Sequence, residues 1–240
     1  MSINFSLVLP CYNEEENIAL LYEEFSRISI DPFKAELIFV NNGSDDNTQK
    51  EIDQIIKDNK NISVKVVCVY LKKNKGYGGG IAEGLAVAKG EYIGWAHADL
   101  QTPLIDFFKL FKLIKNKKNI FGKGFRTNNR GLDGIVSRFH ETLASIILGY
   151  SMKEINAQPK IFSKNLMKYF NNIPHKWTVL DTYATYICLK KSIEIQTIDV
   201  EFKSRIHGQS KWKNNFWNFF CHIFFNLLYL FKLRFTKIEK

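Results

Sequence analysis

Two side chains that can bind a metal ion, His97 and Asp99, follow a short apolar segment at 91–94. The apolar segment predicts a buried strand, and the residues after Pro103 predict a helix rich in Phe and Leu. Ligands of open α/β sheets bind at the carboxyl ends of the strands. Asp99 is therefore placed to hold a divalent cation against a phosphorylated substrate, because such cations prefer oxygen and bridge phosphates. A cap on the next helix is an equally good interpretation of Asp99.

The elements that must position this pair alternate along the first part of the chain. Helical spacing of apolar residues separates the short apolar segments, for example at Ile18, Leu21 and Phe25. Alternation of strand and helix predicts an α/β fold, a mostly parallel sheet with helices on both faces. The predicted strands are 5–10, 36–40, 64–71, 91–94 and 120–126.

Polar or flexible residues follow each of the first four predicted strands. On a parallel sheet these loops gather at one edge, the edge that binds nucleotides. Five residues, 76–80, read Gly-Tyr-Gly-Gly-Gly and follow the third strand, whereas a dinucleotide fingerprint follows the first. The glycines therefore indicate a close backbone approach to a ligand at the start of a helix, and only weakly a nicotinamide cofactor.

The composition indicates the cellular compartment of the protein and the charge of its partners. The chain has 240 residues, of which 45% are hydrophobic, and a formal net charge of +10, which favours anionic partners. The apolar run at 5–9 is too short for the core of a signal peptide. Four scattered cysteines, Cys11, Cys68, Cys188 and Cys221, fit free thiols in a reducing compartment. These features predict a cytoplasmic protein.

Four motifs occur in a fixed order along this framework: Pro-x-Tyr-Asn-Glu-Glu-x-Asn-Ile at 10–18, Asn-Gly-Ser-x-Asp-x-Thr at 42–48, Asn-x-Gly-Tyr-Gly at 74–78, and Asp-Leu-Gln at 99–101. Their order resembles that of family 2 glycosyltransferases, which have the GT-A fold, a Rossmann-like α/β fold. The resemblance covers the first half of the chain closely. Within the family it is similar to the dolichol-phosphate mannose synthase type, which moves a sugar from a nucleotide sugar onto a polyisoprenyl phosphate.

The resemblance implies a role for each motif residue. Asp99 matches the last acid of the family's Asp-x-Asp motif, which binds Mg²⁺ or Mn²⁺ on the donor diphosphate and offsets its charge. Glu15 and Asn42 are the most direct contacts implied for the base and ribose. The implied donor-binding residues are Pro10, Tyr12, Asn13, Glu15, Asn42, Ser44, Asp46, Gly76, Tyr77, Gly78, His97, Ala98 and Asp99.

Two departures from the family pattern change the charge near the donor. Asn41 and Asn42 stand where the family usually has Asp-Asp, and His97 stands where it has the first acid of Asp-x-Asp. Histidine ligates Mn²⁺ better than Mg²⁺, but His97 could instead contact phosphate or sugar, or simply pack. His207 is a further implied metal ligand. Because these acids are absent, a second prediction stays open: a relative of the family that binds a nucleotide sugar without catalytic activity.

The second half carries implied acceptor residues. Arg126 and Arg138 match arginines that bind the acceptor phosphate in the subgroup, which the planar guanidinium suits, although a solvated basic surface is the alternative. Asp181 aligns with a region that supplies a base to hydroxyl acceptors, and an N-cap on a helix at 182–189 is as good an interpretation. The implied acceptor and phosphate residues are Gln101, Arg126, Arg138, Gln158, Arg205, Ser210 and Lys211, and the implied catalytic residues are Asp99, Asp181 and Arg205.

The last aromatic segment, 216–235, predicts a helix with a narrow polar stripe. Its most apolar part, 216–231, would be about 24 Å long, which is short of a hydrocarbon core of about 30 Å. Basic residues flank it, so the segment predicts an amphipathic helix in the interface of an anionic membrane. A helix packed on the catalytic domain or on a second protomer is the alternative.

The sequence thus predicts a GT-A catalytic domain at 1–212, with a nucleotide-sugar half at 1–118 and an acceptor half at 119–212, and a C-terminal amphipathic helix at 213–240. The predicted activity is an inverting, metal-dependent transfer of a sugar from a UDP- or GDP-sugar. The acceptor would be a polyisoprenyl phosphate or another lipid-linked glycan intermediate, met by a peripheral or monotopic protein at the cytoplasmic face of a membrane. A homo-oligomer is compatible with this prediction. The net charge also suggests nucleic acid, but the lysines are dispersed and no binding motif accompanies them, so we expect none.

Overall fold

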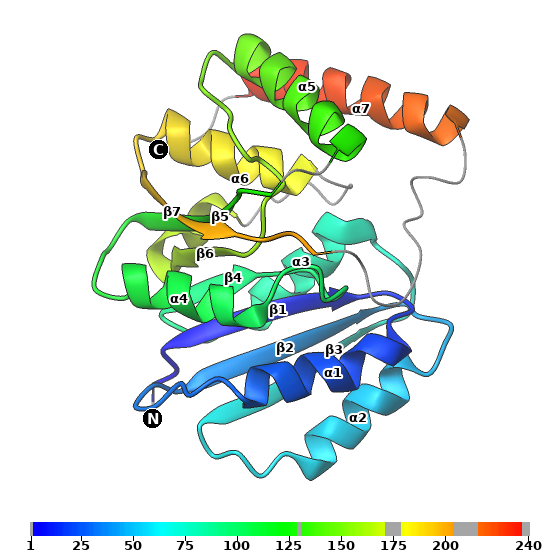
Figure 1. Ribbon diagram of the computed structural model, residues 1–240, viewed down its shortest axis with the longest axis vertical. Coiled ribbons are helices and arrows are strands. Elements are labelled where there is room, and N and C mark those ends of the chain that lie inside the picture. The colour runs from blue at the N-terminus through cyan, green and yellow to red at the C-terminus, as the bar shows by residue number, and fades with distance from the viewer. Residues whose placement is uncertain (1, 129–130, 171–178, 204–215, 237–240) are drawn as a thin grey trace.

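The computed structural model describes residues 2–128, 131–170, 179–203 and 216–236 of the chain (Figure 1). Within these residues seven strands form one sheet in the order β3-β2-β1-β4-β6-β5-β7. Helices cover both faces, so the predicted α/β architecture is confirmed. The two predicted halves contribute to the same sheet, because β6 lies between β4 and β5.

The first four strands are parallel, as the alternation predicts. β1 pairs with β2 and β4, and β2 pairs with β3, so that Leu7 lies opposite Leu37 on one side and Gly94 on the other. The carboxyl ends of these strands therefore meet at one edge. The elements are β1 (Phe5–Cys11), α1 (Glu15–Ser26), β2 (Ala35–Asn42), α2 (Thr48–Asp58), β3 (Val64–Leu71), α3 (Gly76–Val87), β4 (Tyr92–Trp95) and α4 (Leu104–Ile114).

The second half extends the sheet with mixed polarity. β6 runs antiparallel to β4 and β5, whereas β7 runs parallel to β5. At Gly94 a Cβ atom would lie 2.0 Å from the carbonyl oxygen of Lys160, so only glycine lets β6 approach β4 this closely. The elements are β5 (Ile120–Arg126), α5 (Gly131–Leu148), β6 (Lys160–Ser163), the 3₁₀ helix η1 (Lys164–Tyr169), α6 (Val179–Lys190), β7 (Glu194–Val200) and α7 (Phe216–Phe235).

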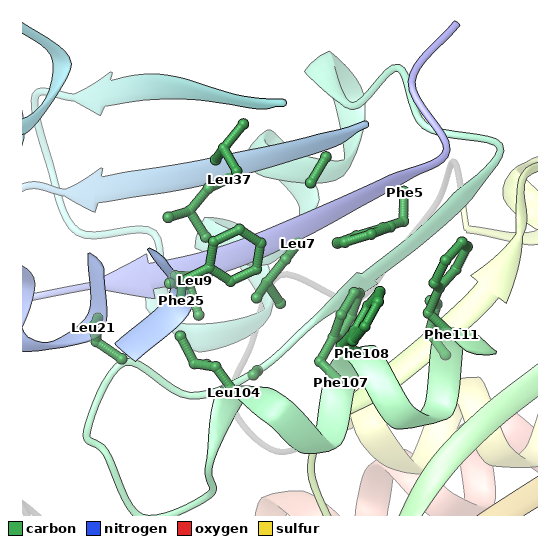
Figure 2. Packing of buried hydrophobic residues seen from close by; sticks show 14 of the residues in the cluster. Phe5, Leu7, Leu9, Leu21, Phe25, Leu37, Leu104, Phe107, Phe108 and Phe111 are labelled. Atoms are coloured by element: carbon green, nitrogen blue, oxygen red, sulfur yellow. The ribbon is translucent and has the colours of Figure 1, made fainter. Parts of the chain in front are cut away.

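The central strands bury both faces, and side chains alternate between two cores. Phe5 and Leu7 of β1 join the core beneath α1, α2 and α4, where the rings of Phe5 and Phe111 are 4.6 Å apart (Figure 2). Val8, which points the other way, joins Trp95 in the core beneath α3 and α6. This double burial makes the sheet edge a rigid base for the loops.

A third apolar cluster joins the last helix to the rest of the protein. Ala144 and Leu148 of α5 pack with Leu230 and Leu233 of α7, and Tyr186 of α6 completes the cluster. In Figure 1, α5 and α7 lie side by side as the outermost layer. Helix α7 therefore packs on the domain through one face, as the alternative interpretation of this segment required. None of the helices in the described part of the chain is long and apolar enough to cross a membrane.

Candidate active site

The loops that follow β1 and β2 are joined by hydrogen bonds. The backbone N–H of Asn13 donates to Ser44 Oγ at 3.0 Å, and that of Glu15 donates to Asp46 Oδ2 at 3.2 Å. In return, the N–H of Asp45 donates to Asn13 Oδ1 at 2.9 Å. Asn13, Glu15, Ser44 and Asp46 are all predicted donor-binding residues, and the structure brings them together at one edge of the sheet. Their side chains hold the two loops in register.

Tyr12 takes part in the same connection, since its hydroxyl donates to Asp45 Oδ2 at 3.3 Å. Asn13 has a positive φ of 57°, a left-handed conformation that asparagine tolerates better than most residues. Pro10 precedes these residues in β1. The first predicted motif is therefore a shaped turn whose backbone and side chains face the loop after β2.

Asn42 connects β2 to the glycine-rich loop. Its Oδ1 accepts the N–H of Lys75 at 2.9 Å, and its Nδ2 donates to the carbonyl oxygen of Gly76 at 3.0 Å and to Asn74 Oδ1 at 3.3 Å. A carboxylate has no N–H group to donate to these two oxygens. The structure thus explains why an amide can replace the family's acid at this position. Gly78 follows in the buried first turn of α3.

His97 and Asp99 leave the end of β4 together. Asp99 is 5% exposed, and its Oδ2 lies 3.8 Å from His97 Nδ1. Asp99 Oδ1 accepts the N–H of Gln101 at 3.2 Å, so the carboxylate stays in the loop. The first N–H of α4, that of Leu104, is instead capped by Glu24 Oε1 at 2.8 Å. Asp99 is therefore not the cap of α4.

The pair of side chains fits a divalent transition metal. Among the described residues no group of three or more His, Cys, Asp or Glu side chains could hold a metal ion. One imidazole and one carboxylate therefore make up the described donor set, and the remaining coordination positions would fall to substrate oxygens and water. The implied third ligand, His207, lies outside the described residues.

Tyr77 lies next to His97. Its hydroxyl lies 3.1 Å from His97 Nε2 and accepts a hydrogen bond from Gln158 Nε2 at 2.9 Å. The rings of Tyr77 and His97 meet edge to face at 5.3 Å. Burial, followed by the negative charge of Asp181, raises the pKa of Tyr77 well above its usual value. Tyr77 is therefore a neutral hydrogen-bonding group beside His97.

A buried ion pair lies beyond Tyr77. Lys160 Nζ is 2.7 Å from Asp181 Oδ1, and both side chains are almost fully buried. Gln158 Nε2 also approaches Asp181 Oδ1, at 3.4 Å. Asp181 is the third residue of α6, inside the helix, so the N-cap interpretation of Asp181 is wrong. Sequence reasoning did not select Lys160, although a lysine within an apolar strand was a usable signal.

In the predicted acceptor half, Arg126 is the last residue of β5. Arg126 Nε pairs with Glu154 Oε2 at 2.6 Å, and its guanidinium lies over the ring of Phe202 at 5.9 Å. Arg126 Nη2 is buried and makes no hydrogen bond with the described residues. Arg138, by contrast, lies on an exposed part of α5. Of the two arginines, Arg126 is the one that presents an unsatisfied buried donor.

Two further lysines, Lys123 and Lys203, lie in this half of the chain. Lys123 is buried on β5, where desolvation and the positive charge of Lys160 lower its pKa to about 8. Gln101 and Lys203 exchange hydrogen bonds, with Gln101 Nε2 donating to the Lys203 carbonyl at 3.0 Å. This contact ties the loop after β4 to the chain that follows β7. The remaining predicted residues, Arg205, Ser210 and Lys211, lie outside the described residues.

Four parallel strands whose carboxyl ends share one edge, an acid that follows β4 and an antiparallel β6 agree with the predicted GT-A fold. The family model described as Glycosyl transferase family 2 matches residues 6–179, and the chain belongs to this family. The protein is therefore a glycosyltransferase, as the resemblance implied.

Relatives and solved structures agree with this assignment. The chain is 26% identical over 236 residues to dolichyl-phosphate beta-glucosyltransferase ALG5D of Trichomonas vaginalis, covering 86% of this chain and 69% of that one. It is 26% identical over 215 residues to undecaprenyl-phosphate 4-deoxy-4-formamido-L-arabinose transferase of Photorhabdus laumondii, covering 86% and 62%. Glucosyl-3-phosphoglycerate synthase of Mycobacterium tuberculosis, solved with Mn²⁺ and UDP-glucose, superimposes with a TM-score of 0.69 at 16% identity, covering 96% of this chain and 79% of that one. The last comparison shows the shared fold.

Proposed function

We propose that this glycosyltransferase moves a sugar from a nucleotide diphosphate sugar onto a polyprenyl phosphate, with inversion at the anomeric carbon. The single observation that carries the proposal is that side chains suited to a metal ion and a side chain suited to a phosphate lie at the same edge of the sheet. His97 and Asp99 follow β4, and Arg126, whose buried Nη2 makes no hydrogen bond with the described residues, ends β5. Relatives named for dolichyl phosphate and undecaprenyl phosphate support this acceptor class.

On the donor side, the loops after β1, β2 and β3 would hold the base and ribose. Asp99 and His97 would hold the divalent metal, Mn²⁺ in preference to Mg²⁺. When bound, this ion offsets the negative charge that develops on the departing nucleoside diphosphate. A structural neighbour solved with Mn²⁺ and UDP-glucose supports a metal-bound nucleotide sugar.

On the acceptor side, Arg126 Nη2 would donate to a phosphate oxygen, to which the planar guanidinium is suited. Gln158 Oε1 is also buried without a hydrogen-bond partner among the described residues. A phosphate is already an oxygen nucleophile near neutral pH, so it needs no general base. This fits the position of Asp181, whose Oδ1 is occupied by Lys160. Direct attack of the phosphate on the anomeric carbon inverts its configuration.

An exposed apolar surface on α5 and α7 supports contact with a membrane. The two helices pack on each other through Leu148 and Leu230. Away from this seam, large apolar side chains stay exposed, and Phe139 and Phe225 are 60% and 66% exposed. The surface, called here the α5–α7 face, consists of Ile135, Val136, Phe139, Ile146, Phe225, Leu228, Phe231 and Phe235.

We place a phospholipid surface on the α5–α7 face, because a lipid acceptor must be met at a bilayer. Lys232 and Arg234 lie in the last turn of α7 and would attract anionic headgroups. Cys11, Cys68 and Cys188 are free thiols, as the reducing environment of a cytoplasmic face allows. A second copy of the chain is the competing occupant of this face.

Purified protein assayed with UDP- and GDP-sugars, Mg²⁺ or Mn²⁺, and dolichyl or undecaprenyl phosphate tests the transfer. We expect sugar on the lipid and release of one nucleoside diphosphate, both lost in Asp99→Ala. Binding of a nucleotide sugar without transfer or hydrolysis under any of these conditions would overturn the proposal and favour a binding protein.

Flotation with vesicles of phosphatidylcholine, with or without phosphatidylglycerol, tests the membrane surface. We expect binding to anionic vesicles that weakens in a Phe225→Ser/Phe231→Ser variant and leaves the fold intact, because both side chains are exposed. Glu51→Ser, on α2 and remote from the α5–α7 face, is the control. A protein that does not bind vesicles but sediments as a dimer, and as a monomer in the variant, would assign the face to self-association instead.

A further inference from the structure

The side chain of Arg126 is held by two neighbouring side chains. Its Nε donates to Glu154 Oε2 at 2.6 Å, and its guanidinium lies over the ring of Phe202 at 5.9 Å. The side chains of Arg126 and Glu154 are only 5% and 14% exposed. A guanidinium carries five N–H groups, one on Nε and two on each Nη atom. Glu154 therefore occupies the Nε–H group, while the buried Nη2 makes no hydrogen bond with the described residues.

Glu154 is itself fixed by the strand that carries Arg126. Lys123 precedes Arg126 on β5, and its Nζ donates to the carbonyl oxygens of Lys153 and of Glu154, the latter at 3.2 Å. The backbone of Glu154 has a φ of 46°, which is uncommon for a residue of this type. Such a conformation persists only where the surrounding structure holds it. Strand β5 thus holds the backbone of Glu154 through Lys123 and its carboxylate through Arg126.

Phe202 is fixed by a separate pair of hydrogen bonds. Asn128 Nδ2 donates to the carbonyl oxygen of Phe202 at 2.7 Å, and the N–H of Phe202 donates to Asn128 Oδ1 at 3.1 Å. These two bonds clamp the backbone of Phe202 and limit where its ring can lie. The guanidinium of Arg126 is therefore bounded by a carboxylate at Nε and by a ring on one face.

We propose that Glu154 is a positioning residue for acceptor binding, which holds the guanidinium of Arg126 so that its Nη groups face the acceptor phosphate. The inference rests on the proposed function, because it takes Arg126 as the residue that binds this phosphate. A guanidinium binds phosphate best through two parallel N–H groups, and an arginine held at Nε can offer such a fork from Nη1 and Nη2. Glu154 does not touch the acceptor itself, because its carboxylate and the phosphate repel each other.

A counter-ion that only neutralises Arg126 is the alternative role of Glu154. The two roles predict different results for Glu154→Gln, because glutamine has the same length and keeps a side-chain oxygen for the Nε–H group but carries no charge. Positioning requires the oxygen, whereas neutralisation requires the charge. Glu154→Ala removes both. Comparison of the two variants therefore separates the role of the oxygen from that of the charge.

Steady-state kinetics with the nucleotide sugar and the polyprenyl phosphate that react in the transfer assay provide the first test. We expect Glu154→Ala to raise KM for the polyprenyl phosphate by about 10- to 100-fold, because a misplaced binding group loses most of its contribution. KM for the nucleotide sugar and the rate of its hydrolysis should not change. Glu154→Gln should lie within about 5-fold of the wild type, because a neutral acceptor keeps about half the strength of the bond. Equal losses in the two variants, or no loss in Glu154→Ala, would overturn the proposal.

Nitrogen NMR of arginine-labelled protein tests the positioning without any enzymatic activity. The spectrum of Arg126→Lys identifies the Nε–H signal of Arg126. In the wild type and in Glu154→Gln we expect this proton to exchange slowly with water, because it is buried and hydrogen-bonded. In Glu154→Ala its exchange should be faster by about 10-fold or more. An Arg126 proton that exchanges in the wild type as fast as that of the exposed Arg27 would overturn the proposal.

Inorganic phosphate added to the same samples tests whether the held guanidinium faces an anion. We expect it to shift the Arg126 signal in the wild type and in Glu154→Gln, and to shift it far less in Glu154→Ala at the same concentration. Equal shifts in all three proteins would overturn the proposal. Because this measurement needs no sugar transfer, a failure of the proposed function would not conceal its result.

Glu194→Ala is the matched control. Glu194 pairs with Lys117 at 2.6 Å, and it lies at the opposite end of the β5–β7 pair from Arg126. This variant loses an ion pair of the same kind in the same part of the sheet. We expect it to keep the KM for the polyprenyl phosphate and the slow exchange of the Arg126 proton. A rise in KM as large as that of Glu154→Ala would mean that Glu154 only supports the fold, and the proposal would fail.

Discussion

The proposed donor side and the proposed acceptor side of the site are built from different interactions. The donor side is held mainly by hydrogen bonds that involve backbone groups and short polar side chains, such as Asn42 between Lys75 and Gly76. The acceptor side is held by buried charges: Lys160 with Asp181, and Arg126 with Glu154. Removing one partner of a buried ion pair lowers the free energy of unfolding far more than removing one partner of a neutral hydrogen bond.

The difference teaches where each kind of contact is useful. The loops of the proposed donor side are fixed by short, directional hydrogen bonds, several of which end on the carboxylates of Asp45 and Asp46. A site for an anionic acceptor needs cations, and cations survive burial only beside counter-ions. The buried lysine and arginine of the acceptor side are accordingly accompanied by carboxylates or carbonyl oxygens.

Removing one buried charge on the acceptor side should cause the largest loss of stability. Lys160→Met leaves the carboxylate of Asp181 buried without its cation, and we expect the free energy of unfolding to fall by about 3–5 kcal/mol. Urea unfolding measures this loss. The Lys160→Met/Asp181→Leu variant should recover most of it, because no buried charge remains. Lys164→Met, an exposed position just after β6, is the control, and an equal loss there would contradict the assignment.

The Arg126→Lys variant tests whether Arg126 serves the acceptor or the donor. Lysine keeps the charge that faces Glu154 but cannot reproduce the planar fork, so the variant loses a charge-assisted hydrogen bond to phosphate. We expect KM for the polyprenyl phosphate to rise by up to about 100-fold, with hydrolysis of the nucleotide sugar unchanged. Arg27→Lys, at an exposed position just after α1, should match the wild type. Equal losses of transfer and hydrolysis would show that Arg126 serves the donor.

Asn42→Asp tests the donor side by restoring the acid that the family usually carries. The new carboxylate cannot donate to Gly76 or Asn74, and it would repel the carbonyl oxygen of Gly76. We expect the free energy of unfolding to fall by about 1–2 kcal/mol. The exposed Asn47→Asp substitution in the next loop is the control. A stabilised Asn42→Asp protein would show that Asn42 does not clamp the loop.

The proposed acceptor side should also make the stability of the protein depend on pH. Burial lowers the pKa of Lys123 from 10.5 to about 8, so between these values the unfolded chain binds the proton more tightly than the folded chain does. The contribution of Lys123 to the free energy of unfolding therefore rises as the pH increases from about 8 to 10.5. Urea unfolding of wild type and Lys123→Met across this window should show a smaller rise in the variant, in which only other buried groups such as Lys160 still contribute. Lys65→Met, exposed on β3, should keep the wild-type rise.

Much of the donor side follows from the sequence alone. Alternating apolar segments predicted four parallel strands, and the third lies where it was predicted, at Val64–Leu71. Polar residues after each strand predicted a ligand-binding edge, because parallel strands place their carboxyl ends together. Each of these features depends on only a few neighbouring residues, and the order of the motifs indicated the family.

The acceptor side was decided by tertiary structure. The antiparallel strand β6 has four residues, too few for a periodic signal, and its place between β4 and β5 depends on strands far away in the chain. The ion pair of Lys160 and Asp181 joins β6 to α6, and the contact of Tyr77 with Gln158 spans 81 positions. Local periodicity cannot encode such pairings, because they follow from how whole elements pack. The sequence thus determined the fold and the family and pointed to Asp99, whereas packing alone decided which buried charges and hydroxyls lie near that carboxylate.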